Sequence, residues 1–432
     1  METLVCGHVA YPGKSRMCRH LVGRGEDGVP PHVRRLTGRG LDFDLLCAGC
    51  DGQPVELVVT CEGCVAVYLD DDHRALTAWR GEAGIAERPE PLDVRVRASP
   101  LPRGHGPVVD LAPVAGRAAW LLLAADGTIL HFDGGTGEAA ALVTTTVPGE
   151  GDHSPWDGHP LRRRLHASTD GRFAAVVNDF GHLGQVLDLR TGQVTIALHG
   201  GDYHSNTVPF SLAFAVHAGR TVVVHRTEWN RLEVSDPATG ALLTTREITA
   251  YRVGRERPPH YLDYFHGALY ASPDGRWLAD DGWVWHPCGI PVVWELRRWL
   301  TDNPWESEDG PTRKTLCWRD YHWTSPMCWV GSDLLALSGI GVDDEALLPG
   351  VRVFDAASGA ELIAFPGPAG ALFAAGRRLY SADPAGLTVW DPFTGERTGA
   401  VPGFVPTRHH PGARELVAVE GDTLVRWGYP PS

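Results

Sequence analysis

Four cysteines near the N-terminus have a type and spacing suited to binding a metal ion. Cys47 and Cys50 form one Cys-x-x-Cys pair, and Cys61 and Cys64 form a second, with ten residues between the pairs. Two such pairs can place four thiolates around one tetrahedral Zn²⁺, as in structural zinc sites. The alternatives are two disulfides or unligated cysteines. The spacing therefore predicts one zinc ion that helps this region to fold.

A second possible metal set lies upstream. Cys6-x-His8 and Cys18-x-His20 are matching pairs, with nine residues between His8 and Cys18. Together they offer the two thiolates and two imidazoles of a Cys₂His₂ zinc site. The alternative is that only the two cysteines bind, or that the histidines are exposed polar residues. We therefore expect one zinc ion and allow for two.

The region between the Cys-x-x-Cys pairs contains an apolar strand, Pro54–Val59, so this part of the chain resembles a zinc ribbon. It is also locally basic, because residues 1–40 hold seven Lys and Arg against three Asp and Glu. The whole chain carries a net charge of -14, which disfavours binding to a polyanion. Contact with nucleic acid is therefore an alternative only for residues 1–65.

A second group of candidate residues combines carboxylates, imidazoles and indoles. Aromatic rings beside carboxylates can form a pocket for a peptide or a cationic ligand. The alternative is that the tryptophans fill the core and the acids cap turns. The group comprises Asp263, His266, Asp280, Asp281, Trp283, Trp285, His286, Trp305, Glu306 and Asp309.

The elements that position these residues follow from a repeated turn. A hydrophobic strand ends in Asp, and two variable residues, a small residue (Ser or Thr) and Gly precede the next strand. Asp can bond the backbone two residues on, and Gly supplies the positive φ of a tight hairpin. With little sequence that favours long helices after residue 107, the pattern predicts an all-β fold. The copies are Asp133–Gly137, Asp188–Gly192, Asp236–Gly240, Asp355–Gly359 and Asp391–Gly395.

Five such turns, separated by tens of residues, resemble those of WD-repeat and related bacterial β-propellers, and Trp390-Asp391 matches the dipeptide in the family's name. The resemblance covers about residues 107–432 and implies a β-propeller of about seven four-stranded blades, with six or eight as alternatives. The expected blades span residues 107–148, 163–200, 209–249, 266–322, 323–367, 368–403 and 404–430.

The remaining chain divides into a cysteine-rich module, residues 1–80, and a linker, residues 81–106. In the linker, Leu92–Arg97 alternates as a strand and could close the ring by completing the last blade. The fourth blade is expected to carry an insertion, with a helix over Trp294–Leu300 and a polar loop over Asn303–Gly310. Long loops on a rigid scaffold often carry function.

These features favour a non-catalytic binding scaffold, in which propeller loops and the zinc module contact a protein partner. The sequence lacks the Gly-x-Ser-x-Gly and His-Glu-x-x-His motifs of common hydrolases and metalloproteases. The alternative is a lyase or hydrolase that uses the His and carboxylate residues at the mouth of the propeller channel. The longest apolar run, Ala118–Ala125, is too short to span a membrane, and no secretory signal is visible. We therefore expect a cytoplasmic monomer.

Overall fold

The computed structural model describes residues 16–22, 32–36, 43–50, 53–59, 92–114, 118–149, 159–248, 251, 256–285, 287–341 and 347–430. Nearly all regular structure in these ranges is β-strand, which confirms the all-β prediction. The helices among them are short: η2 (Ser205–Thr207), α3 (Leu296–Thr301) and α4 (Glu306–Asp309). None of these described helices is long and apolar enough to cross a membrane.

The N-terminal sheet has the strand order β2-β3-β1-β4. Its central pair, β1 and β3, is parallel, with Met17 beside Leu45. Strand β4 is shorter than the expected 54–59 strand and runs antiparallel to β1. The strands are β1 (Arg16–Cys18), β2 (His32–Leu36), β3 (Phe43–Cys47) and β4 (Leu57–Val59).

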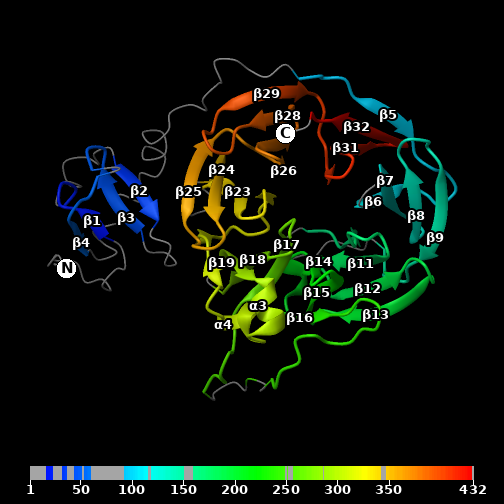
Figure 1. Ribbon diagram of the computed structural model, residues 1–432, viewed down its shortest axis with the longest axis horizontal. Helices are drawn as coiled ribbons and strands as arrows, with labels where there is room; N and C mark the ends of the chain where they lie inside the picture. Colours follow the sequence, from blue (N-terminus) through cyan, green and yellow to red (C-terminus); the bar gives the residue numbers. More distant parts are fainter. Residues whose placement is uncertain are drawn as a thin grey trace.

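The other sheets are antiparallel and follow one another around a ring, the arrangement of a β-propeller (Figure 1). The first two contain β6 (Val108–Val114), β7 (Ala119–Ala124), β8 (Thr128–Asp133) and β9 (Ala139–Thr144), then β10 (Arg162–Ala167), β11 (Phe173–Asp179), β12 (Leu183–Asp188) and β13 (Gln193–His199). The next two contain β14 (Leu212–His217), β15 (Arg220–Glu228) and β16 (Arg231–Ser235), then β17 (Phe265–Ala271), β18 (Trp277–Val284), β19 (Cys288–Glu295), β20 (Lys314–Thr315) and β21 (Arg319–Asp320).

Three further sheets complete the ring in the described residues. They contain β22 (Met327–Val330), β23 (Leu334–Ile340), β24 (Leu348–Asp355) and β25 (Glu361–Pro366), then β26 (Ala371–Ala375), β27 (Arg378–Asp383), β28 (Gly386–Trp390) and β29 (Arg397–Pro402). The last sheet joins β30 (Arg408–His410), β31 (Glu415–Glu420) and β32 (Thr423–Gly428) to β5 (Arg97–Pro100) from the start of the ring.

The hydrophobic core lies between successive sheets. Leu165 of the second sheet packs in one cluster with Leu121 of the first. The last sheet packs on the first in the same way, because Val417 and Leu424 share a cluster with Trp120. The apolar clusters therefore connect the last sheet to the first as well as each sheet to the next. Burial of apolar surface between the sheets stabilises the ring.

The repeated turn forms as the sequence predicts. In the first copy, the Asp133 carboxylate accepts hydrogen bonds from the backbone N–H groups of Gly135 (2.7 Å) and Thr136 (3.0 Å). The N–H of Gly137 donates to the Asp133 carbonyl at 2.8 Å, and Gly137 has a φ of 78°. The same conformation joins the third and fourth strands in most of the sheets.

Three details differ from expectation. The third sheet has three strands, because the chain after Asp236 forms only an isolated bridge between Ser235 and Leu242 and then leaves the edge of β16. The strand that pairs with β32 begins at Arg97, the last residue of the expected stretch, and Val94 and Val96 within that stretch are exposed. Helix α3 starts two residues later than expected, because Trp294 continues β19.

Candidate functional site

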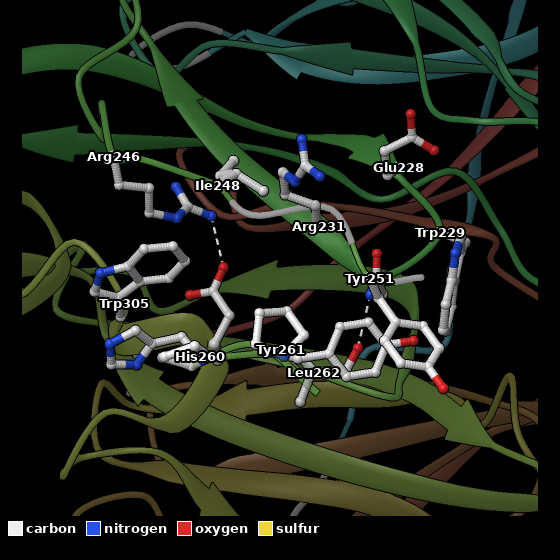
Figure 2. A pocket seen from close by; sticks show the side chains of 14 residues that line it. Glu228, Trp229, Arg231, Arg246, Ile248, Tyr251, His260, Tyr261, Leu262 and Trp305 are labelled. Carbon is white, nitrogen blue, oxygen red and sulfur yellow. Dashed lines mark hydrogen bonds and ion pairs between the residues drawn. The ribbon is translucent and has the colours of Figure 1, made fainter. Parts of the chain in front are cut away.

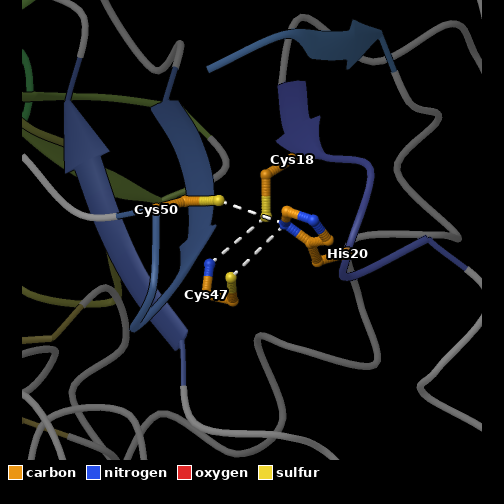
Figure 3. Close-up of side chains that lie close together, drawn as sticks. All are labelled: Cys18, His20, Cys47 and Cys50. Atoms are coloured by element: carbon orange, nitrogen blue, oxygen red, sulfur yellow. Dashed lines mark hydrogen bonds between the residues drawn. The ribbon is translucent and has the colours of Figure 1, made fainter. Parts of the chain in front are cut away.

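A cluster of possible metal ligands lies where β1 and β3 end. Because these strands are parallel, their carboxyl ends meet at one edge of the sheet, which brings Cys18 beside Cys47. Each strand leads into a tight turn, in which Leu21 N–H donates to the Cys18 carbonyl and Cys50 N–H donates to the Cys47 carbonyl. The two turns add His20 and Cys50 to the same edge (Figure 3).

The ligand atoms of Cys18, His20, Cys47 and Cys50 all lie within 4.8 Å of one another. His20 Nδ1 is 3.1 Å from Cys50 Sγ and 3.7 Å from Cys47 Sγ. The backbone N–H of Cys47 donates to Cys18 Sγ at 3.3 Å. This set of three thiols and one imidazole fits a closed tetrahedral zinc site.

The crowding of thiols perturbs their acidity. Burial, together with the neighbouring thiols of Cys47 and Cys18, raises the pKa of Cys50 to about 11. Burial also acts to raise the pKa of Cys47, but hydrogen bonds with Cys50 and Cys18 outweigh it and lower that pKa. Three thiols this close favour a bound cation, which would compensate the charge of the thiolates.

This grouping differs from the one the spacing suggested. Cys47 and Cys50 lie with Cys18 and His20, which were expected to belong to a separate set. The reason is the parallel pairing of β1 with β3, a non-local contact that ligand spacing does not encode. The remaining predicted ligands, Cys6, His8, Cys61 and Cys64, lie outside the described residues.

A cavity of about 390 Å³ lies between the outer edge of the third sheet and helix α4 (Figure 2). The turn between β15 and β16, the chain after the third sheet, and α4 all contribute to its walls. Its lining combines aromatic rings with charged groups. The side chains used below are Glu228, Trp229, Asn230, Arg231, Arg246, Tyr251, His260, Tyr261, Trp305 and Glu308.

Arg246 holds one end of this cavity together. Its guanidinium donates to Glu233 of β16 (2.8 Å), to Glu308 of α4 (2.6 Å) and to the Leu232 carbonyl (3.0 Å). It also lies over the Trp305 ring, 5.1 Å from its centre. Burial raises the pKa of Glu233, while Arg246 acts in the opposite direction.

His260 packs on the same tryptophan. Its ring stacks on Trp305 at 4.5 Å, and its Nδ1 is 2.9 Å from the Asp309 carboxylate. His260 has a φ of 60°, a conformation that non-glycine residues rarely adopt and that the surrounding contacts must hold. This end of the cavity is therefore closed by contacts among its own residues.

The ten candidate residues of the sequence do not gather in one place. Trp305 lines the cavity and Asp309 bonds His260 beside it, whereas Asp263 is partly exposed and pairs with Arg257 at 2.7 Å. Glu306 is fully buried and accepts hydrogen bonds within its own loop, including one from the Thr312 N–H at 2.8 Å. His286 lies outside the described residues.

The remaining candidates lie inside or beside the core of the fourth sheet. His266 and Asp280 are buried against each other, with Nδ1 2.6 Å from the carboxylate. Asp281 is also buried, and this burial raises its pKa to about 7. The alternative in which acids and tryptophans serve the fold therefore holds for these residues and for Trp283, which stacks on Phe265 at 4.3 Å.

An exposed aromatic surface continues from the cavity. Trp285 is 41% exposed and contacts His204, which in turn contacts Tyr203. Tyr203 is 48% exposed and contacts Trp229 in the cavity wall, with ring centres 5.6 Å apart. Tyr251, also in the cavity wall, packs on Tyr261 with ring centres 4.9 Å apart.

Sequence reasoning missed most of the cavity. Arg231, Arg246, Tyr251 and Tyr261 come from the end of the third sheet and the chain that follows it. One signal was present: the unusually long stretch between the turn at Asp236–Gly240 and the next strand at Phe265. Such a long connection in a repeat fold often carries function.

No family model and no curated protein matches the chain. Among solved structures, the chain is similar to one in the "Crystal Structure of Mitotic Checkpoint Complex", with 14% sequence identity and a TM-score of 0.47. The match covers 79% of this chain and 95% of the other. A likeness this distant carries no inference about function.

Proposed function

We propose that this chain is a non-catalytic binding scaffold, a seven-bladed propeller that holds a peptide segment of a partner protein in the cavity between β16 and α4. The observation that carries the proposal is the cavity itself, whose volume of about 390 Å³ suits a few side chains of a ligand. Its walls combine aromatic rings with charged groups, the composition that dominates binding energy at protein interfaces.

The aromatic surface beside the cavity supports this function. Tyr203, Trp285 and Tyr251 are 48%, 41% and 38% exposed. Exposed aromatic rings gain favourable free energy when a partner buries them. They also lose little conformational entropy on binding. The contacts from Trp285 through His204 and Tyr203 to Trp229 make one path along which an extended peptide can lie.

The buried acid–base residues favour a scaffold over an enzyme. His266 is 1% exposed and Asp280 is fully buried. The second oxygen of Asp280 accepts a hydrogen bond from the Gly267 N–H at 2.9 Å, so both carboxylate oxygens have partners within the sheet. A general acid or base must reach its substrate. This pair instead fixes the start of β17 against β18.

A peptide display selection on the full chain tests the proposed function. We expect selected peptides to bind the wild type and to lose at least about tenfold in affinity for Trp229→Ala and Tyr251→Ala, since each ring removed is an interface anchor. Phe393→Ala is the matched control, because Phe393 is 41% exposed on a different sheet. Equal binding to all variants would place the peptide site elsewhere and refute the proposal.

A second proposal concerns the N-terminal module. We infer that Cys18, His20, Cys47 and Cys50 bind one zinc ion that stabilises this small sheet. The turns after β1 and β3 supply a complete set of four ligands, and a site with four protein ligands leaves no position for substrate. The described cysteines are free thiols, and we propose a reducing, cytoplasmic location that keeps them available for metal. Elemental analysis of the full chain should find zinc, and a metal-free, folded module would refute this assignment.

A further inference from the structure

Arg231 occupies an unusual position in the cavity wall. It is half-buried, and its guanidinium makes no hydrogen bond or ion pair with any residue in the described part of the chain. The nearby Glu233 carboxylate, whose acidity Arg231 influences, already accepts from Arg246 and Thr244. In contrast, both terminal nitrogens of the Arg246 guanidinium donate to the third sheet, and one of them also donates to helix α4. Arg231 is thus the cavity arginine with donors available to a ligand.

The turn that carries Arg231 is held rigidly. Asn230 Nδ2 donates to the Leu262 carbonyl at 2.7 Å, and the Trp229 carbonyl accepts the His266 N–H at 3.0 Å. The Trp229 ring also packs on Phe265, with ring centres 4.4 Å apart. These contacts fix the start of β16, so little conformational entropy is lost when Arg231 binds a ligand.

The sign of the ligand's charge follows from the exposure of the two charged residues of this turn. Glu228 is exposed, so water can solvate its carboxylate. Arg231 is half-buried and has lost part of its hydration, while the nearby Glu233 carboxylate already accepts from Arg246 and Thr244. A guanidinium binds a carboxylate through two parallel hydrogen bonds, which makes it selective for planar anions. The Arg231 guanidinium is therefore available to bind an anionic group of a ligand.

We infer that the cavity binds a peptide in which an aspartate or glutamate carboxylate pairs with Arg231 and an adjacent apolar or aromatic side chain packs on Trp229 and Tyr251. Figure 2 shows the guanidinium of Arg231 in the same cavity as these rings. This inference rests on the proposed function and specifies the chemistry of the partner: an acidic peptide with a hydrophobic neighbour.

The test is the composition of peptides selected from a random display library by the full chain. We expect enrichment of Asp or Glu beside an aromatic or aliphatic residue. Arg231→Glu should reverse the preference toward Lys and Arg, because it replaces the cation of the cavity with an anion. Arg190→Glu is the matched control, since Arg190 is an exposed arginine of the turn after β12.

Direct binding then measures the contact. A selected peptide and its copy with Glu changed to Gln should differ by at least about tenfold in Kd on the wild type, the strength of a charge-assisted hydrogen bond. The two peptides should bind Arg231→Gln with similar Kd. This neutral variant also serves as the folding check, because its thermal unfolding should match that of the wild type.

The outcomes separate the two claims. If selected peptides depend on Trp229 but show no acidic preference, and bind Arg231→Glu as well as wild type, this inference is wrong while the scaffold function stands. If no selected peptide depends on Trp229 or Tyr251, both the inference and the proposed function are wrong.

Discussion

Arg246 and Glu308 form a buried ion pair, 2.6 Å between nitrogen and oxygen, that joins the chain following the third sheet to helix α4 of the fourth. Both side chains are more than nine-tenths buried, and the guanidinium also pairs with Glu233 at 2.8 Å. The third sheet has no fourth strand beside β16, and there the Arg246 side chain donates a hydrogen bond to the Leu232 carbonyl of β16. One arginine thus protects a sheet edge and positions one wall of the cavity.

Replacing Arg246 with Met should destabilise the protein strongly. The substitution keeps much of the apolar stem but leaves Glu233 and Glu308 buried without a cation, which costs about 3 kcal/mol or more. Urea unfolding measures the change. Arg95→Met is the matched control, because Arg95 pairs with Asp93 in water and exposed pairs contribute little. Equal effects of the two substitutions would contradict the role given to Arg246.

Asp281 should make stability depend on pH. Burial raises its pKa to about 7, although Arg319 and the Ser325 N–H act to lower it. The folded state therefore binds this proton more tightly than the unfolded state, whose carboxyl has an ordinary pKa near 3.9. The resulting stabilisation is fully present at pH values below the unfolded-state pKa, and it is lost as the pH rises through the folded-state pKa of about 7.

Asp281→Asn cannot lose this proton, so its stability should not fall in the same way. Relative to wild type, the variant should gain about 2 kcal/mol in free energy of unfolding between pH 5 and pH 8. Buried histidines with lowered pKa values, such as His225 and His322, also titrate, but they are common to both proteins and cancel in the difference. A difference that does not change with pH would show that Asp281 is charged throughout.

Two turn glycines offer a test of the repeat. Gly137 and Gly395 occupy the same turn position, with φ values of 78° and 76°. Alanine at Gly137 would meet open space and should cost about 1 kcal/mol from backbone strain alone. Alanine at Gly395 would place its Cβ 2.7 Å from Phe365 Cβ, so we expect a clearly larger loss in thermal unfolding. Equal losses would mean that neighbouring blades do not pack closely at this turn.

Much of the fold could be predicted because its signals are local. The turn at Asp133–Gly137 is specified by five consecutive residues, and its hydrogen bonds lie within them. Repetition of that turn then indicates the hairpins of an all-β ring. The long connection after Gly240 was visible in the same way, as an interruption of the repeat.

The candidate sites depend on contacts between distant residues, which the spacing of residues along the chain does not encode. Cys18 meets Cys47 because β1 and β3 pair in parallel across 29 residues of sequence. Arg246 stands in an ordinary polar stretch, and its partner Glu308 is 62 residues away. Neither relationship leaves a periodic or spaced pattern that a single sequence can reveal.

The grouping of the metal ligands can be tested by substitution. Cys18→Ser should abolish zinc binding by the full chain as completely as Cys47→Ser, because one ligand of the same ion is removed in each. Cys328→Ala, which removes a cysteine of the ring, should leave the zinc content unchanged. If Cys18→Ser keeps its zinc while Cys61→Ser loses it, the ion belongs to the two Cys-x-x-Cys pairs instead.

The central claim is that the cavity is where a partner protein binds, and site-specific photo-crosslinking in the native cells tests it most directly. p-Benzoylphenylalanine is placed at Tyr251 in the cavity wall or, as the control, at Phe393 on another sheet; both positions are well exposed. We predict a discrete crosslinked protein from position 251 that is absent from position 393 and is lost when Trp229→Ala is added. The same products from both positions, or products that persist in Trp229→Ala, would contradict the account.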